Sequence, residues 1–103
     1  MNLEVSLKLK SALIARGYNV YMIRETNDVS LSNKKRALMA NESGSDILLR
    51  IHCNSADSQS ANGALTMSPT LSNPYCRSIA ADSQELSECV VSTLCRRTGA
   101  VNR

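Results

Sequence analysis

The sequence contains no tryptophan and no phenylalanine, and its only aromatic residues are the tyrosines Tyr18, Tyr21 and Tyr75. A hydrophobic core would therefore consist of Leu, Ile, Val, Ala, Met and Cys side chains. No stretch approaches the roughly 18 consecutive apolar residues of a membrane-spanning helix, and the first residues lack the pattern of a signal peptide. At 103 residues, the chain is expected to form at most one small domain.

Basic residues are scattered, with a net charge of only +3. They cluster at 34–36 and at 96–97. We expect the first cluster on an exposed helix face and the second at a helix C-terminus, where the helix dipole favours cations. Aromatic side chains do not alternate with either cluster, so we expect no binding of nucleic acid.

The four cysteines, Cys53, Cys76, Cys89 and Cys95, form no C-x-x-C pair. A zinc site built on paired cysteines is therefore not expected. Cys89 and Cys95 are six residues apart on a predicted helix, which places them on different faces. We expect the four thiols to be small buried hydrophobic groups.

Two short helices are predicted in the first half of the chain. Residues 2–16 satisfy both the alternation of a strand and the spacing of a helix, but good helix formers and the stop at Gly17 favour a helix over 3–16. A second helix is predicted over 33–43, with Ser32 or Asn33 as its N-cap. Both helices are of ordinary length for a small domain.

Three strands and a long helix complete the prediction. Runs rich in β-formers or aliphatic residues predict strands at 19–24, 46–52 and 64–68. Asn73-Pro74 has the pattern of a helix start, and that helix is expected to end near Arg97 with Gly99 as its C-cap. The resulting order of helix, strand, helix, strand, strand and helix predicts an α/β layered fold. Three short strands would make an incomplete sheet.

His52 is the only histidine of the chain, and it ends the predicted strand 46–52. Open α/β sheets place their ligand crevice at the carboxyl ends of strands. A polar loop, 54–63, follows directly. Imidazole is a common zinc ligand and an acid–base group, whereas a lone histidine is often a packed or surface residue. The residues by themselves leave both interpretations open.

Arg50 shares a strand face with His52, at a distance of about 7 Å along the strand. It could hold a substrate carboxylate, or it could be a partly buried arginine paired with an acid of the core. Arg24 is better explained by a local salt bridge with Glu25 or Asp28. A zinc hydrolase needs about three protein ligands, and by spacing no acid or cysteine forms a constellation with His52.

Several segments follow one another in a recognisable order. They are Asn2 to Lys10, Leu13 to Arg24, Asp28 to Ser32, Arg36 to Asn41, Arg50-Ile-His-Cys-Asn-Ser55 and Asn62 to Met67. This order resembles the zinc-dependent N-acetylmuramoyl-L-alanine amidases of the amidase-3 type. The resemblance runs through the whole chain, and its most specific part lies between Arg36 and Ser55.

This resemblance implies an α/β fold with a mixed central sheet between two layers of helices. Residues 1–103 would be part of the catalytic domain, without the first strand and without the last strand and helix. The family binds one Zn²⁺ through two histidines and a glutamate, and its I-H-x-N histidine matches His52. The other two ligands would precede Met1, and the general-base glutamate would follow Arg103.

The activity implied is hydrolysis of the amide between N-acetylmuramic acid and L-alanine in peptidoglycan. Zinc would lower the pKa of a bound water to about 7, and the glutamate would act as base and then as acid. Asn54 and Arg50 would contact the substrate. The protein would act outside the cell or in the cell wall, or in the periplasm of a host with an outer membrane. Residues 1–103 alone are expected to be inactive.

The alternative is a non-catalytic cell-wall-binding module that has the same fold but an incomplete zinc site. A glycine-histidine turn and a glutamate before Met1, with a glutamate-bearing strand after Arg103, would favour the enzyme.

Overall fold

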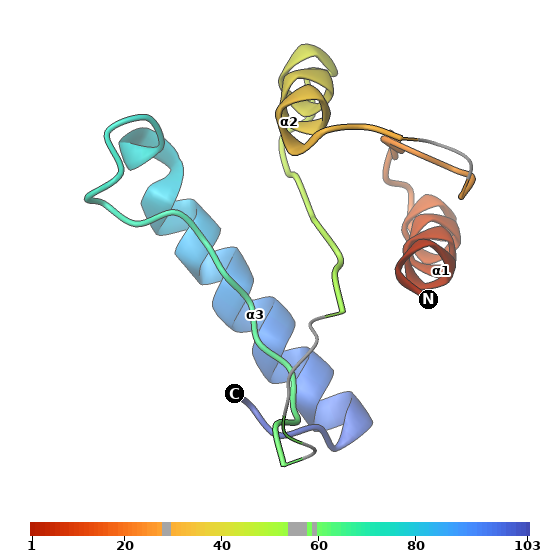
Figure 1. Ribbon diagram of the computed structural model, residues 1–103, viewed down its shortest axis with the longest axis vertical. Helices are drawn as coiled ribbons and strands as arrows, with labels where there is room; N and C mark the ends of the chain where they lie inside the picture. The colour runs from red at the N-terminus through yellow and green to blue at the C-terminus, as the bar shows by residue number, and fades with distance from the viewer. Residues whose placement is uncertain (28–29, 54–57, 59) are drawn as a thin grey trace. The chain divides into compact units, whose positions relative to one another are not determined.

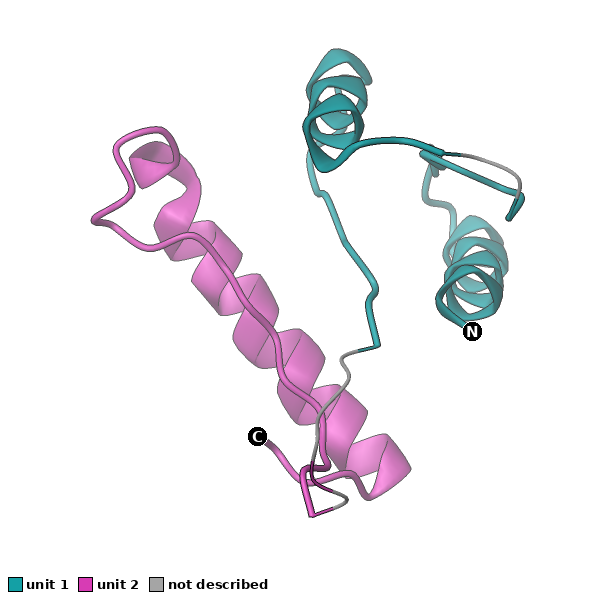
Figure 2. Ribbon diagram, in the orientation of Figure 1, with its two compact units in different colours: residues 1–55 teal, residues 56–103 magenta. Residues whose placement is uncertain are grey.

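The computed structural model describes residues 1–27, 30–53, 58 and 60–103, and the chain divides into two compact units, 1–55 and 56–103 (Figures 1 and 2). Among the described residues, no helix is both long and apolar enough to span a membrane. The helices are α1 (Asn2–Ala15) and α2 (Asn33–Glu42) in the first unit, and the 3₁₀ helix η1 (Arg77–Ile79) and α3 (Ala80–Thr98) in the second.

Helix α1 confirms the helix predicted over 3–16, and it ends as its sequence predicts. Gly17 adopts a left-handed conformation with φ 89°. Its N–H donates to the Ile14 carbonyl at 3.0 Å, and the N–H of Tyr18 donates to the Leu13 carbonyl at 3.1 Å. This pair of bonds is a Schellman motif, which satisfies carbonyls that the last turn would otherwise leave without partners.

Helix α2 confirms the second predicted helix and decides between its two candidate caps. The Ser32 hydroxyl accepts a hydrogen bond from the Lys35 N–H at 3.1 Å, so Ser32 is the N-cap. Asn33 is instead the first helical residue, and its side chain is available for other contacts.

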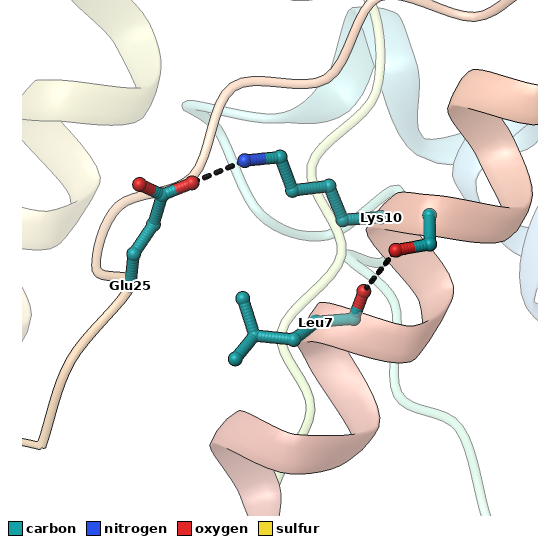
Figure 3. A network of polar contacts seen from close by, with 4 residues as sticks. Leu7, Lys10 and Glu25 are labelled. Atoms are coloured by element: carbon teal, nitrogen blue, oxygen red, sulfur yellow. Dashed lines mark hydrogen bonds and ion pairs between the residues drawn. The ribbon is translucent and has the colours of Figure 1, made fainter.

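An ion pair links α1 to the chain that follows it. The Lys10 ammonium contacts the Glu25 carboxylate (Figure 3). Both side chains are partly exposed, so the pair is expected to contribute no more than about 1 kcal/mol. Glu25 is one of the two acids expected to form a salt bridge with Arg24. In the structure, it pairs with Lys10 instead.

Helix α3 begins later than predicted, because Asn73 forms local turns. Its side-chain oxygen accepts from the Tyr75 N–H at 2.9 Å, and its carbonyl accepts from the Cys76 N–H at 3.3 Å. These bonds compete with helix formation, and α3 starts only after η1. The predicted end is confirmed, since Gly99 caps α3 with φ 74°.

The segment before η1 runs along α3 (Figures 1 and 2). The Thr66 hydroxyl donates to the Ser87 carbonyl at 2.9 Å, and the Gln84 amide donates to the Pro69 carbonyl at 3.3 Å. After α3 the chain returns, and Ala64 and Asn102 form an isolated parallel bridge. The segments around Ala64 and Asn102 therefore run parallel to each other. Helix α3 lies in the connection between them, and a parallel pair requires such a long crossover connection.

The expected α/β layered helix–mixed sheet–helix fold is wrong for this structure. Throughout the described ranges, the regular elements are helices, and the only β contact is the bridge of Ala64 with Asn102. The segments 19–24, 46–52 and 64–68 form no strands. Alternating or aliphatic residues predict an extended chain, but a strand also needs a neighbour about 4.7–4.9 Å away. No described segment supplies that neighbour along a ladder.

Little apolar surface is buried in either unit. In the described part of the chain, only Leu3 and Ala80 are buried. The expectation of buried cysteines is also wrong, because Cys53 and Cys89 are exposed and Cys76 and Cys95 are half-buried. The predicted pattern required covered faces on both sides of a sheet, and without the sheet these side chains face solvent.

Replacement of Gly63 by alanine should loosen the parallel bridge. Gly63 has φ 115°, and a Cβ there would lie 2.4 Å from the Val101 carbonyl oxygen, which accepts from the Ala64 N–H at 2.8 Å. Backbone strain of this kind costs roughly 1–3 kcal/mol. Amide hydrogen exchange at Ala64 should therefore be at least about fivefold faster in Gly63→Ala.

Gly44→Ala is the matched control, since Gly44 also has positive φ, 70°, but its added Cβ would meet nothing within 4 Å. Exchange at Ala64 should not change in this control. Unchanged exchange at Ala64 in Gly63→Ala would contradict the close approach of the two segments.

Candidate functional site

The segment with the predicted site residues lies in the first unit, after α2. From residue 47 to residue 53 it has no helix or strand (Figure 1). Ile47 and Leu48 are 58% and 60% exposed. Arg50 and His52 are exposed as well, whereas Ile51 between them is half-buried. The predicted site is therefore an open surface, and its chemical groups are accessible to a ligand.

His52 lies next to a residue that contacts the start of α1. The Cys53 N–H donates to the Asn2 side-chain oxygen at 3.0 Å, and the Cys53 thiol lies 3.4 Å from the Met1 sulfur. These contacts bring the N-terminal end of α1 next to His52, although the two positions are about fifty residues apart in the sequence. The site thus combines two distant parts of the first unit.

Arg50 contacts the start of α2. Its guanidinium donates to the Asn33 side-chain oxygen at 3.2 Å. The alternative of a partly buried arginine paired with an acid is wrong, because the side chain is exposed and its partner is a neutral amide. An amide leaves the guanidinium charge unneutralised, so Arg50 retains the charge needed to bind an anion.

Two asparagines that the sequence analysis missed therefore hold the site segment. Asn2 and Asn33 are each the first residue of their helix, and each side chain accepts one hydrogen bond from residues 50–53. Residues at a helix start commonly satisfy their own helix. Because Ser32 already caps α2, Asn33 can bond to Arg50 instead. No pattern in the sequence could have shown these long-range contacts.

Asn54, the other expected substrate contact, lies outside the described residues, as does Asp28, one of the two partners expected for Arg24. The polar loop 54–63 is described only at residue 58 and from residue 60 onward.

The described side chains do not by themselves fit a zinc site. Zinc sites with catalytic activity use about three protein ligands. Within the ranges that the structure covers, no three His, Cys, Asp or Glu side chains gather closely enough to hold a metal ion. His52 could supply one imidazole, and the rest of a ligand set would have to lie elsewhere.

Comparison with known proteins gives one family. The family model described as N-acetylmuramoyl-L-alanine amidase matches residues 1–103, which is the whole sequence and both units. The matched region includes Arg50, His52 and Asn54. Searches of curated proteins and of solved structures found no match. The family resemblance inferred from the residues is thereby confirmed.

Replacement of Asn2 by alanine should release the segment that carries His52. The variant loses the acceptor for the Cys53 N–H, and a hydrogen bond of this kind contributes about 0.5–1.5 kcal/mol. Amide exchange at Cys53 should be roughly twofold to tenfold faster. Asn2→Asp keeps an acceptor oxygen at the same position and should preserve most of the protection. Equal exchange rates in the wild type and in Asn2→Ala would show that this contact does not position the segment.

Proposed function

The chain belongs to the N-acetylmuramoyl-L-alanine amidase family, and we propose that residues 1–103 form part of a catalytic domain that hydrolyses the amide between N-acetylmuramic acid and L-alanine. The observation that carries this proposal is the family match, which extends over both units and all the predicted site residues. Family members act on cell-wall peptidoglycan. We therefore place the protein outside the cell or in the cell wall, and in the periplasm if the host has an outer membrane.

His52 is proposed as one ligand of a zinc ion, since the family is generally zinc-dependent. The contact between Cys53 and Asn2 supports this role, because it joins the residue after His52 to the start of α1. By the resemblance, the ligand glutamate precedes Asn2 by a few residues, and a residue there would be near His52. Arg50 and Asn54 are proposed to contact the substrate, and Arg50 is exposed and charged as that role requires.

Residues 1–103 alone are proposed to be inactive. A hydrolytic metal centre needs several ligands and a general base, and within the described ranges no three His, Cys, Asp or Glu side chains gather to hold a metal ion. The ligands and the general-base glutamate are therefore proposed to lie outside the described residues, in line with the resemblance.

A non-catalytic cell-wall-binding module is the second candidate function. The observation that favours it is the same lack of a metal-binding group among the described residues. The flanking sequence discriminates between the two. A glycine-histidine turn and a glutamate before Met1, with a late glutamate after Arg103, support the enzyme.

Peptidoglycan digestion tests the proposed reaction. Purified peptidoglycan is incubated with the full encoded protein or with residues 1–103, and newly exposed N-terminal L-alanine is measured by amino-group labelling. The full protein should release L-alanine N-termini, and residues 1–103 should release none above background. His52→Ala in the full protein should lower the rate by more than about 100-fold, since even residues that only orient metal ligands cost 10–100-fold.

Arg96→Gln is the control, because Arg96 lies in the last turn of α3 in the other unit. It should leave the rate unchanged. New reducing sugar ends without new L-alanine N-termini would contradict the amidase reaction. Full activity in His52→Ala would contradict only the proposed role of His52 and would leave the amidase reaction as proposed.

A further inference from the structure

The first turn of α2 has an unusual charge pattern. Lys34 and Lys35 lie in this turn, which contains no acidic residue. The N-terminal end of a helix carries a partial positive charge, and acidic side chains are normally favoured there. Both lysines are exposed. The cations therefore oppose the helix dipole, and nothing in the packing of α2 requires them.

Arg50 adds a third cation at the same end of α2. Its guanidinium bonds to Asn33, the residue before Lys34, at 3.2 Å. The charges come from two separate segments of the first unit. Arg36 is excluded from this group because it is half-buried and its side chain donates to the Leu31 carbonyl at 3.3 Å.

These three cations, which we call the cationic patch, have no acidic partner among the described residues. The ion pair found there joins Lys10 and Glu25, which are not part of the patch. Asn33 and Ser32 contribute neutral oxygen acceptors only. Lys34 and Lys35 line one exposed hollow, and Arg50 is exposed at the same end of α2, so the patch is complementary to an anion.

The surface next to the patch is a shallow hollow along α2. Glu42, the acid on this surface, is seven residues from Lys35, about 10 Å along a helix. Leu38 and Met39 lie between them in the sequence. The positive end of the hollow is therefore separate from its acidic end. The hollow is lined by Ser32, Lys34, Lys35, Leu38, Met39 and Glu42.

We propose that Lys34, Lys35 and Arg50 bind carboxylates of the peptide that peptidoglycan carries on its N-acetylmuramic acid. This inference rests on the proposed function, and it adds a specificity surface to the proposed site. Arg50 lies two residues from His52, about 7 Å along an extended chain. A peptide joined through L-alanine ends in at least one carboxylate, so an anion is part of the substrate.

The expected effect is moderate and depends on salt. Exposed ion pairs are individually weak, and charges beyond about 10 Å are screened at 0.1 M salt. Loss of two lysines should weaken binding roughly twofold to thirtyfold. The same loss should not unfold α2, because glutamine is nearly as good a helix former as lysine and the change removes charges that oppose the dipole.

The test is sedimentation of the chain with two preparations of peptidoglycan at low salt. Both are first stripped of phosphodiester polymers, and in one the carboxylates are then converted to neutral amides. Lys34→Gln/Lys35→Gln is compared with Arg96→Gln/Arg97→Gln, which removes the same charge from the last turn of α3. Helix content of each variant is checked by circular dichroism.

The patch is supported if amidation weakens binding of the wild type, and if the lysine variant loses binding to native peptidoglycan while the arginine variant does not. Equal binding to both preparations would overturn the patch and leave the amidase proposal intact. Equal losses in the two variants would assign the effect to net charge and also overturn the patch. Charge-dependent binding that returns only when the phosphodiester polymer is restored would overturn the carboxylate as the ligand.

Absence of binding to either preparation would contradict peptidoglycan as the substrate, and with it the proposed function.

Discussion

The hydrogen bond from the Cys53 N–H to the Asn2 side chain joins the residue after His52 to the first helix. The contact of Arg50 with Asn33 and the approach of the Cys53 thiol to the Met1 sulfur also hold this exposed segment, residues 47 to 53, within the first unit. Each hydrogen bond of this kind contributes about 1 kcal/mol. Two asparagines at the starts of two helices therefore hold the segment that carries Arg50 and His52.

Exposed apolar surface is the second constraint. A continuous aliphatic run such as Ile47 to Leu49 is typical of a strand covered on both faces, yet these side chains are 58%, 60% and 46% exposed. Burial of apolar area stabilises a folded chain by about 25 cal/mol per Å². The exposed side chains of residues 47–49 do not contribute this stabilisation. The exposure supports the proposal that residues 1–103 act as part of a larger domain.

The helices could be predicted because their signals are local. Ser32, Gly17 and Gly99 mark helix ends through bonds to residues three or four positions away. The predicted strands are wrong, because a strand also depends on a distant neighbour that local signals do not reveal. Asn73-Pro74 shows the limit of local signals, since Asn73 bonds to Tyr75 and delays α3 to Ala80.

For the candidate site, the sequence supplied residue types and the structure supplied contacts. His52 and Arg50 were identified because of their chemistry and their place after an apolar run, and both are accessible. Their partners Asn2 and Asn33 could not be found, because each contact joins positions far apart in the chain. The amidase assignment itself depends on the family match, because the spacing of acids around His52 does not indicate a metal site.

The central claim is that His52 is one member of a ligand set whose other members are not among the described residues. Zinc titration of residues 1–103 by calorimetry, beside His52→Ala, tests this claim most directly, because a single imidazole cannot form a tight zinc site. The account predicts no stoichiometric nanomolar site in the wild type and closely similar titrations for both proteins. A stoichiometric nanomolar site that disappears in His52→Ala would contradict it and would show that these residues complete the metal centre themselves.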